Sequence, residues 1–196
     1  MFLKILFYQA RHRLMVTVLL WLLMMGGMLP PDSGAVRWKA ESLYHGPISR
    51  RNRYRRETVG FVFQRFHLFP YLSVADNIRL PLTFQEKAVD GEDVERLAVR
   101  LGIQDRLRHR PSQLSVGEQQ RTAVARALAG GRELILADEP TGNLDTENAA
   151  IIANCLLEEC RRGRTVVVAT HDPSLLAIGG RRIPVVSGRL GDVPAS

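Results

Sequence analysis

Three short apolar runs along the chain predict strands of a parallel sheet. Leu134 to Ala137 are four consecutive aliphatic residues, and Thr165 to Ala169 form a second such run. Continuous apolar runs of this length are typical of strands that are buried on both faces. Val59 to Phe63 adds a third run, rich in β-branched and aromatic residues. Because helical patterns separate these runs, the chain is predicted to have an α/β fold.

The segments between the predicted strands have helical spacing of apolar residues. Ser73 and Ser115 each precede such a segment and are suited to cap a helix. The expected helices span Ile48–Glu57, Ser73–Leu80, Gly91–Leu101, about 115–128, with Val124, Ala127 and Leu128 on its apolar face, and about Glu147–Arg161. Residues from roughly 70 to 130 are therefore predicted to form a helical subdomain inserted into the sheet.

The first apolar segment, Leu14–Leu29, admits three interpretations. It follows several basic residues, as a membrane anchor or a signal peptide does. A spanning helix needs about 20 apolar residues, however, and this run is shorter and contains Gly26 and Gly27. No small-residue cleavage site follows it. We expect a buried core helix that ends at the glycines.

Two further segments are predicted to be extended. Ala35–Leu43 shows strand-like alternation around Val36 and Trp38. Arg182–Val186, with a turn at Ser187 and Gly188, predicts a final pair of strands.

Composition and charge narrow the possible classes of protein. A chain of 196 residues with 45% apolar residues suits a single globular domain. Its net charge of +7 would suit nucleic acid, an anionic membrane or a phosphate-bearing ligand. Much of the excess lies in the arginine run 50–56, which we interpret as a solvated helix face. Cys155 and Cys160 match neither a zinc site nor a disulfide framework, so a reducing cytosol is expected.

Functional side chains follow three of the predicted strands. Asp138 and Glu139 end the strand at Leu134, Gln64 ends the strand at Val59, and His171 follows the strand at Thr165. In open α/β sheets, ligands bind at the carboxyl ends of parallel strands. Two adjacent carboxylates there suit phosphoryl transfer: one can hold Mg²⁺ while the other orients or deprotonates a water.

A possible anion site lies at the start of the predicted helix at Ser115, within the sequence LSVGEQQR. The free backbone N–H groups of a helix N-terminus attract anions, and Gly117 leaves the backbone bare beside Ser115. Taken alone, this motif is more often a structural helix cap.

Taken together, these residues resemble the nucleotide-binding subunits of ATP-binding cassette (ABC) transporters. VFQ at Gln64 resembles the Q-loop, LSVGEQQR the signature motif and LILADEP the Walker B strand. Asp145 in NLD resembles the D-loop, and His171 in VATHD the switch histidine. Their order and spacing match over roughly Gly26 to Gly188. The sequences of these motifs are most similar to those of the family branch that serves lipoprotein release, macrolide export and cell division.

The resemblance implies a P-loop NTPase-like fold and a head-to-tail dimer, formed either by two copies of this chain or with a related ATPase subunit, with ATP and Mg²⁺ between the two. Glu139 would be the base or the residue that orients the water, and Asp138 and Gln64 would serve Mg²⁺. His171 would contact the γ-phosphate, while Ser115, Gly117 and Glu118 would act in trans on the nucleotide of the partner.

The same resemblance implies where the protein works. It would be peripheral to the inner face of the plasma membrane, in the cytoplasm, and would drive a transmembrane permease. The permease would dock near the Phe66–Tyr71 loop and the helical insert. No nucleic-acid partner is expected.

The N-terminal part departs from the family pattern and is predicted to be incomplete. The family requires Gly-x-x-x-x-Gly-Lys followed by Ser or Thr, and this sequence occurs nowhere in the chain. The lysine position falls on Val18, and the glycines of the loop fall on His12 to Thr17. The preceding strands and the adenine-stacking aromatic residue are also expected to be absent. Val116 replaces a glycine of the signature motif.

Two explanations of this departure compete. The chain is either a shortened or frame-shifted ATPase subunit, which the retention of Glu139 and His171 favours, or a degenerate subunit that lends only its signature motif. Two other classes stay open. A basic nucleic-acid-binding protein would explain the charge, and a membrane-anchored regulator would use residues 14–29.

Overall fold

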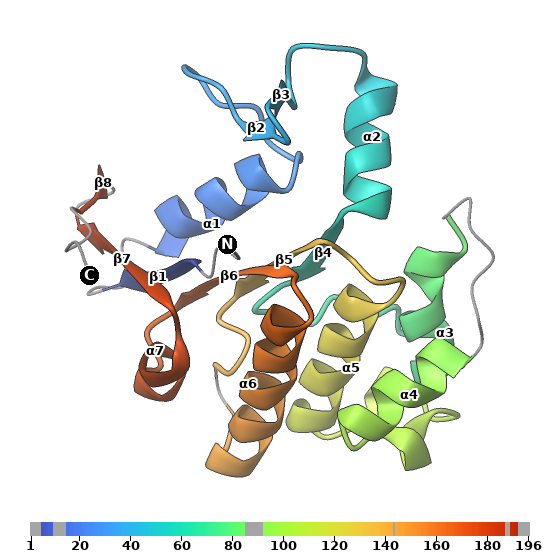
Figure 1. Ribbon diagram of the computed structural model, residues 1–196. Helices are drawn as coiled ribbons and strands as arrows, with labels where there is room; N and C mark the ends of the chain where they lie inside the picture. Colours follow the sequence, from blue (N-terminus) through green and yellow to red (C-terminus); the bar gives the residue numbers. More distant parts are fainter. Residues whose placement is uncertain (1–4, 10–14, 85–91, 143, 187–188, 192–196) are drawn as a thin grey trace.

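The computed structural model describes residues 5–9, 15–84, 92–142, 144–186 and 189–191, and a six-stranded sheet lies at its centre (Figure 1). The strand order is β4-β5-β6-β1-β7-β8. The strands are β1 (Ile5–Gln9), β4 (Val59–Val62), β5 (Leu134–Asp138), β6 (Thr165–Thr170), β7 (Arg181–Val186) and β8 (Arg189–Leu190). All neighbours are parallel except β7 and β8. The prediction of an α/β fold with a parallel sheet is confirmed.

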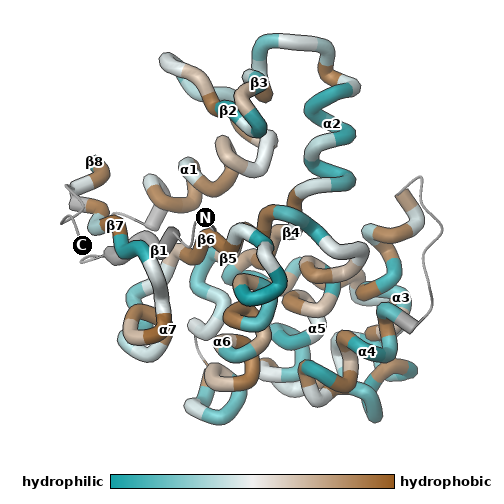
Figure 2. Tube along the Cα trace, in the orientation of Figure 1, coloured by the Kyte–Doolittle hydropathy of each residue, from teal (hydrophilic) through white to brown (hydrophobic). Residues whose placement is uncertain are grey.

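The two faces of the sheet are covered by different helices, as Figure 1 shows. On one face, Leu134 and Leu136 of β5 belong to an apolar cluster with residues of α1 (Met15–Met25) and α2 (Ile48–Glu57). On the other face, Ile135 and Ala137 join a larger cluster with α5 (Val116–Leu128) and α6 (Thr146–Arg161). Alternate residues of a strand point to opposite faces, and both faces of β5 are covered. A continuous apolar run is therefore needed to fill both contacts. The run accordingly appears apolar along its length in Figure 2.

Strand β1 contradicts the expectation that no strand precedes the first apolar helix. It pairs in parallel with both β6 and β7, with Ile5 opposite Val167 on one side and Arg181 on the other. Periodicity did not identify this strand, because five residues are too few to show a pattern of their own.

Helix α1 forms where a core helix was predicted, and ends just before Gly26 and Gly27. Gly27 has φ 72°, a left-handed conformation that glycine adopts readily at a helix end. Burial is one-sided, because Val18 and Leu22 are buried whereas Leu20 is 38% exposed. Among the described residues, no helix is long and apolar enough to cross a membrane.

The segment predicted as one strand at Ala35–Leu43 is instead a small hairpin. Strands β2 (Arg37–Trp38) and β3 (Glu41–Ser42) are antiparallel. Lys39 and Ala40 between them both have positive φ, as a two-residue hairpin turn requires. The single-strand prediction was therefore wrong, because it took the turn residues as part of the alternation.

Helix α2 spans the predicted residues, and its arginines are exposed or half-buried, as expected of a solvated face. Tyr54 is its one buried residue, and the Tyr54 hydroxyl donates to the Met25 carbonyl at 2.9 Å. This bond ties α2 to the end of α1.

The remaining predicted helices form within a few residues of the expected bounds. Between β4 and β5 the chain forms α3 (Val74–Arg79), α4 (Glu92–Arg100), α5 and three short 3₁₀ turns, η2 (Leu80–Leu82), η3 (Gln104–Arg106) and η4 (Pro111–Gln113). Helix α6 follows β5, and α7 (Pro173–Ile178) follows β6. The predicted final strand pair is β7 and β8, while its turn at Ser187 and Gly188 lies outside the described residues.

Gly60→Ala should destabilise the fold, because α5 approaches β4 at this glycine. A Cβ on Gly60 would lie 2.0 Å from the carbonyl oxygen of Ala127, which is backbone and cannot move alone. Overpacking of a core typically costs about 1–3 kcal/mol, and we expect the upper end of that range. Urea denaturation would measure it.

The matched control is Gly46→Ala, because the nearest atom to a Cβ there is the end of the Arg50 side chain at 3.8 Å. Equal stability of the two variants would contradict the close approach of α5 to β4.

Candidate functional site

The ends of β5 and β6 bring the predicted acidic pair and histidine together. Asp138 is opposite Ala169 in the register of the two strands, and the Glu139 N–H donates to the Ala169 carbonyl at 2.9 Å. Both strands run in the same direction, so Asp138, Glu139 and His171 reach the same edge of the sheet. The structure therefore places these three residues together at the strand ends where the sequence predicted them.

Glu139 is held in a fixed position although it is nearly fully buried. It is 3% exposed, and its Oε2 accepts a hydrogen bond from the Thr170 hydroxyl at 3.1 Å. Its Oε1 lies 2.7 Å from Nδ1 of His171, whose side chain is 68% exposed. Its φ of 44° is uncommon for a residue with a side chain and is the kind of strain found at functional sites. The carboxylate is thus oriented by two partners from the neighbouring strand end.

Asp138 lies beside Glu139 and is 7% exposed. Burial, followed by the negative charge of Glu139, raises the pKa of Asp138 from 3.8 to about 6. Both effects disfavour the ionised form, and a nearby cation would relieve both. This carboxylate is therefore the one that gains most from a metal ion.

A cavity of about 540 Å³ opens next to this pair of acids. Glu139, His171 and Asp172 line it, together with residues of the turn after β5 and of α6. The Thr141 hydroxyl donates to Asp172 Oδ2 at 2.7 Å, which joins the two loops across the cavity wall. Burial raises the pKa of Asp172, but hydrogen bonds from Thr141 and Ser174 outweigh it and hold the pKa below its usual value.

Gln64 does not line this cavity. It lines a separate one of about 750 Å³ with residues of its own loop, such as Phe66 and His67, and Gln119 of α5. The Arg126 guanidinium, from α5, donates to the carbonyls of Phe66 at 2.7 Å and His67 at 2.5 Å. The structure thus places Gln64 after β4, next to the strand of the acids, but does not bring it into the group formed by Glu139 and His171.

The helix predicted at Ser115 has the expected cap. The Ser115 hydroxyl accepts from the Glu118 N–H at 3.2 Å, and the Glu118 carboxylate accepts from the Ser115 N–H at 2.8 Å. This bond from the Ser115 backbone is the main reason that the pKa of Glu118 is lowered. Glu118 also pairs with Arg106 at 2.8 Å. The side chain of Glu118 is therefore engaged in capping α5, and Val116 beside it is half exposed.

Gly117 lies close to the side chain of Asn148. A Cβ at Gly117 would lie 2.7 Å from the side-chain carbonyl of Asn148 in α6. The Asn148 N–H donates to the carboxylate of Asp145, the N-cap of α6, at 2.8 Å. The starts of α5 and α6, which carry two of the predicted motifs, are thus in direct contact.

Sequence reasoning missed several residues that build this site. The Gln120 amide donates to the Pro140 carbonyl at 2.9 Å, which links α5 to the turn after the acids. Gln120, Thr170 and Asp172 lie within or next to the recognised motifs, but only the folded chain shows what they contact.

The predicted phosphate-loop positions are divided between described and undescribed residues. Residues 10–14, which connect β1 to α1, lie outside the described part of the chain. Val18, at the predicted lysine position, is 2% exposed in the apolar cluster between α1 and the sheet. A side chain there faces the core.

Comparison with known proteins shows what this arrangement is similar to. Residues 17–142 match the family described as ABC transporter. The chain is 43% identical, over 162 residues, to the macrolide export ATP-binding/permease protein MacB of Burkholderia thailandensis. That match covers 82% of this chain and 25% of the relative, so the chain spans about a quarter of the length of such curated relatives.

Two solved structures of the cassette MJ0796 are similar over nearly the whole chain. A dimeric structure, described as a bacterial ABC transporter cassette, superposes with a TM-score of 0.84 and 33% identity, covering 96% of this chain and 84% of the other. A post-hydrolysis dimer of the same protein, bound to ADP and Pi, has a TM-score of 0.84 and 32% identity and covers 98% and 86% of the two chains.

Asp138→Asn should change how stability depends on pH. The folded state binds the Asp138 proton more tightly than the unfolded state, so the wild-type protein loses stability as pH rises from about 4 to about 6. The amide of the Asp138→Asn variant does not ionise, so the stability of the variant should not fall over this pH range. In metal-free buffer at about pH 7 the variant should be more stable by on the order of 2 kcal/mol, and at about pH 4 the two should be equal.

Chemical denaturation over this pH range would measure the effect. Asp105→Asn, at an exposed position, serves as the control and should give a difference that is independent of pH. A flat difference for Asp138→Asn as well would show that the Asp138 carboxylate is not destabilised by its surroundings.

Proposed function

The chain belongs to the ABC transporter family, and from this membership we propose that it is an ATPase domain that drives a membrane permease and works in a pair with a second such domain. The relative MacB is an ATP-binding/permease protein, and the MJ0796 cassette forms a dimer, which supports both partners. We place the domain at the cytoplasmic, inner face of the plasma membrane. The exposed Phe69 and Tyr71, 52% and 86% accessible, are our proposed contact for the permease.

The observation that carries the proposal is the fixed position of Glu139 beside Asp138. In ATP hydrolysis a water attacks the γ-phosphate and must lose a proton. Glu139 is the group that would orient this water and accept its proton, because its carboxylate is preorganised by Thr170 and His171. His171 is exposed on the side away from Glu139 and would contact the phosphate.

The residues present fit a magnesium ion in part. Asp138 supplies a carboxylate whose ionised form is disfavoured without a cation, and Gln64 supplies an amide oxygen. Among the described residues no group of three or more His, Cys, Asp or Glu could hold a metal by itself. Mg²⁺ usually keeps several waters and phosphate oxygens as ligands, so a site with few protein ligands suits it. When bound, the ion would neutralise phosphate charge.

The residues of this chain do not fit the phosphate-binding loop that the family requires. The connection from Ala10 to Leu14 has no glycine, and Val18 faces the core. This favours a second candidate function, in which the chain completes the site of its partner through Ser115 and Gly117. The well-formed cap of α5 and its contact with the Asp145 turn support that role.

Hydrolysis by a mixed pair distinguishes the two roles. The chain is combined with a family ATPase domain that has an intact glycine-rich loop, and phosphate release is measured. If the chain only lends its signature motif, Ser115→Arg should lower the rate at least tenfold, because a bulky cation replaces the hydroxyl at the start of α5. Glu139→Gln should then leave the rate unchanged.

If the chain also hydrolyses ATP at its own site, Glu139→Gln should remove up to half of the rate. Asp32→Asn, at an exposed position in the turn after α1, is the matched control. A rate that neither Ser115→Arg nor Glu139→Gln changes would exclude both proposed roles.

The chain alone should bind MgATP weakly. A missing lysine and backbone nest remove several charge-assisted hydrogen bonds, each of roughly 1.5–3 kcal/mol. Calorimetry should therefore give a dissociation constant above about 100 µM. A micromolar constant would contradict the assignment of an incomplete cradle.

A further inference from the structure

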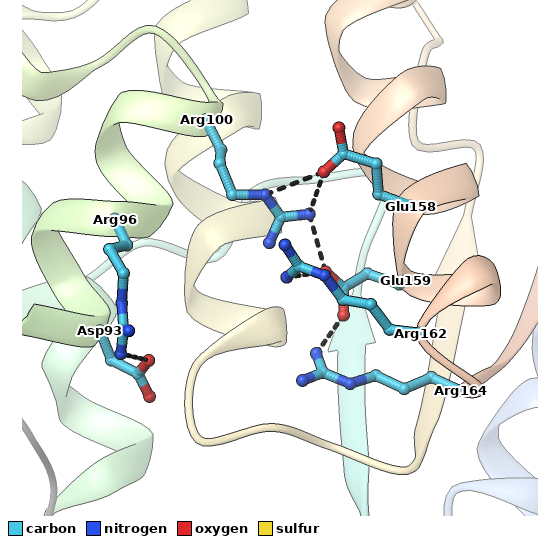
Figure 3. A network of polar contacts seen from close by, with 7 residues as sticks. All are labelled: Asp93, Arg96, Arg100, Glu158, Glu159, Arg162 and Arg164. Carbon is cyan, nitrogen blue, oxygen red and sulfur yellow. Dashed lines mark hydrogen bonds and ion pairs between the residues drawn. The ribbon is translucent and has the colours of Figure 1, made fainter.

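A further polar cavity lies where α4 meets the end of α6, and four arginines line it. Its volume is about 330 Å³. The guanidinium groups come from Arg96 and Arg100 of α4 and from Arg162 and Arg164 after α6. Among the described residues that line it, Asp93 is the one acidic residue. Figure 3 shows the network to which these side chains belong.

This cavity is at the opposite edge of the sheet from Glu139. Gly131 precedes the first residue of β5, and Arg164 precedes the first residue of β6, and both line the cavity. Asp138 is the last residue of β5, so the strand separates the two sites by about 15 Å at roughly 3.3 Å per residue. The proposed ATP site does not account for these arginines.

A buried glutamate, Glu159, holds three of the four arginines in place. Glu159 is fully buried, and its Oε1 accepts from Arg100 at 2.8 Å and from Arg162 at 3.3 Å, while its Oε2 accepts from Arg164. Arg100 also donates to Glu158 at 2.8 Å. Neither glutamate lines the cavity. The carboxylates therefore orient the guanidinium groups without covering their cavity side.

The charges and donors around the cavity favour an anion. The network in Figure 3 contains four arginines and three carboxylates. The described residues that line the cavity include all four arginines but one of the acids, Asp93. Each guanidinium has five N–H donors, and a single carboxylate cannot accept hydrogen bonds from all the donors of three arginines. Side chains that are already held in place lose little entropy when a ligand binds.

We propose that this cavity binds a small, multiply charged anion with phosphate chemistry. The forked donors of arginine match phosphate oxygens, and about 330 Å³ suits a small molecule. This inference goes beyond the proposed ATPase function and does not depend on it. The competing interpretation is that the network only clamps α4 to α6.

The test is calorimetric titration of the full chain with inorganic pyrophosphate in magnesium-free buffer. The double variant Arg96→Gln and Arg162→Gln should weaken binding at least tenfold. Both side chains are more than half exposed, at 62% and 52%, so the fold should persist, which circular dichroism would check. A structural clamp alone predicts no pyrophosphate binding by any form.

The matched control is the double variant Arg50→Gln and Arg79→Gln, which removes the same charge elsewhere. Arg79 pairs with Asp76 at 2.9 Å and i,i+3 spacing, as Arg96 pairs with Asp93. The control should bind like the wild type. Equal weakening of both double variants would reduce the effect to overall charge and overturn the proposal.

One further variant locates the bound anion. Glu139→Gln should leave pyrophosphate binding unchanged, and a change in binding in this variant would place the anion at the edge that carries Glu139 and overturn the proposal. Co-sedimentation with phosphatidylglycerol vesicles, displaced by pyrophosphate, would identify the phosphate source as a lipid headgroup; its absence would identify a free anion.

Discussion

The parallel pairing of β5 with β6 is the constraint on which the rest of the structure depends. Both strands are buried on two faces, so their alternate residues anchor α1 and α2 on one side and α5 and α6 on the other. The same pairing sets Asp138 opposite Ala169 and brings Glu139 to Thr170 and His171. The core and the candidate site are therefore consequences of one register, and a slip of that register would disrupt both.

The edge of the sheet that carries Asp138 and Glu139 has an electrostatic and a conformational cost. Burial and the charge of Glu139 raise the pKa of Asp138, and Glu139 itself has a left-handed backbone. Hydrogen bonds from Thr170 and the contact with His171 offset part of this cost for Glu139 but not for Asp138. Such local instability is typical of sites that a ligand completes, and a cation beside Asp138 would relieve it.

Helix α5 connects the two parts of the proposed machinery. Its start carries Ser115 and packs through Gly117 on Asn148, while Gln120 donates to the turn that follows the acids. Near its end, Arg126 holds the loop after Gln64. The surface that would meet a second domain and the turn that carries Glu139 therefore belong to one packed unit. The segment 10–14, which corresponds to part of the phosphate-binding loop of the family, contains no glycine.

The sequence by itself determined the buried strands, most helices and their caps, because these follow from periodicity and from contacts within a few residues. It also determined that Asp138, Glu139 and His171 lie at the ends of buried strands, whereas the structure decided that these strands are neighbours. Only the tertiary structure decided that β1 completes the sheet, that Gln64 lines a separate cavity, and that Arg100 and Arg164 meet at Glu159. These contacts join residues far apart in the chain, and local patterns carry no record of which distant partner a side chain will find.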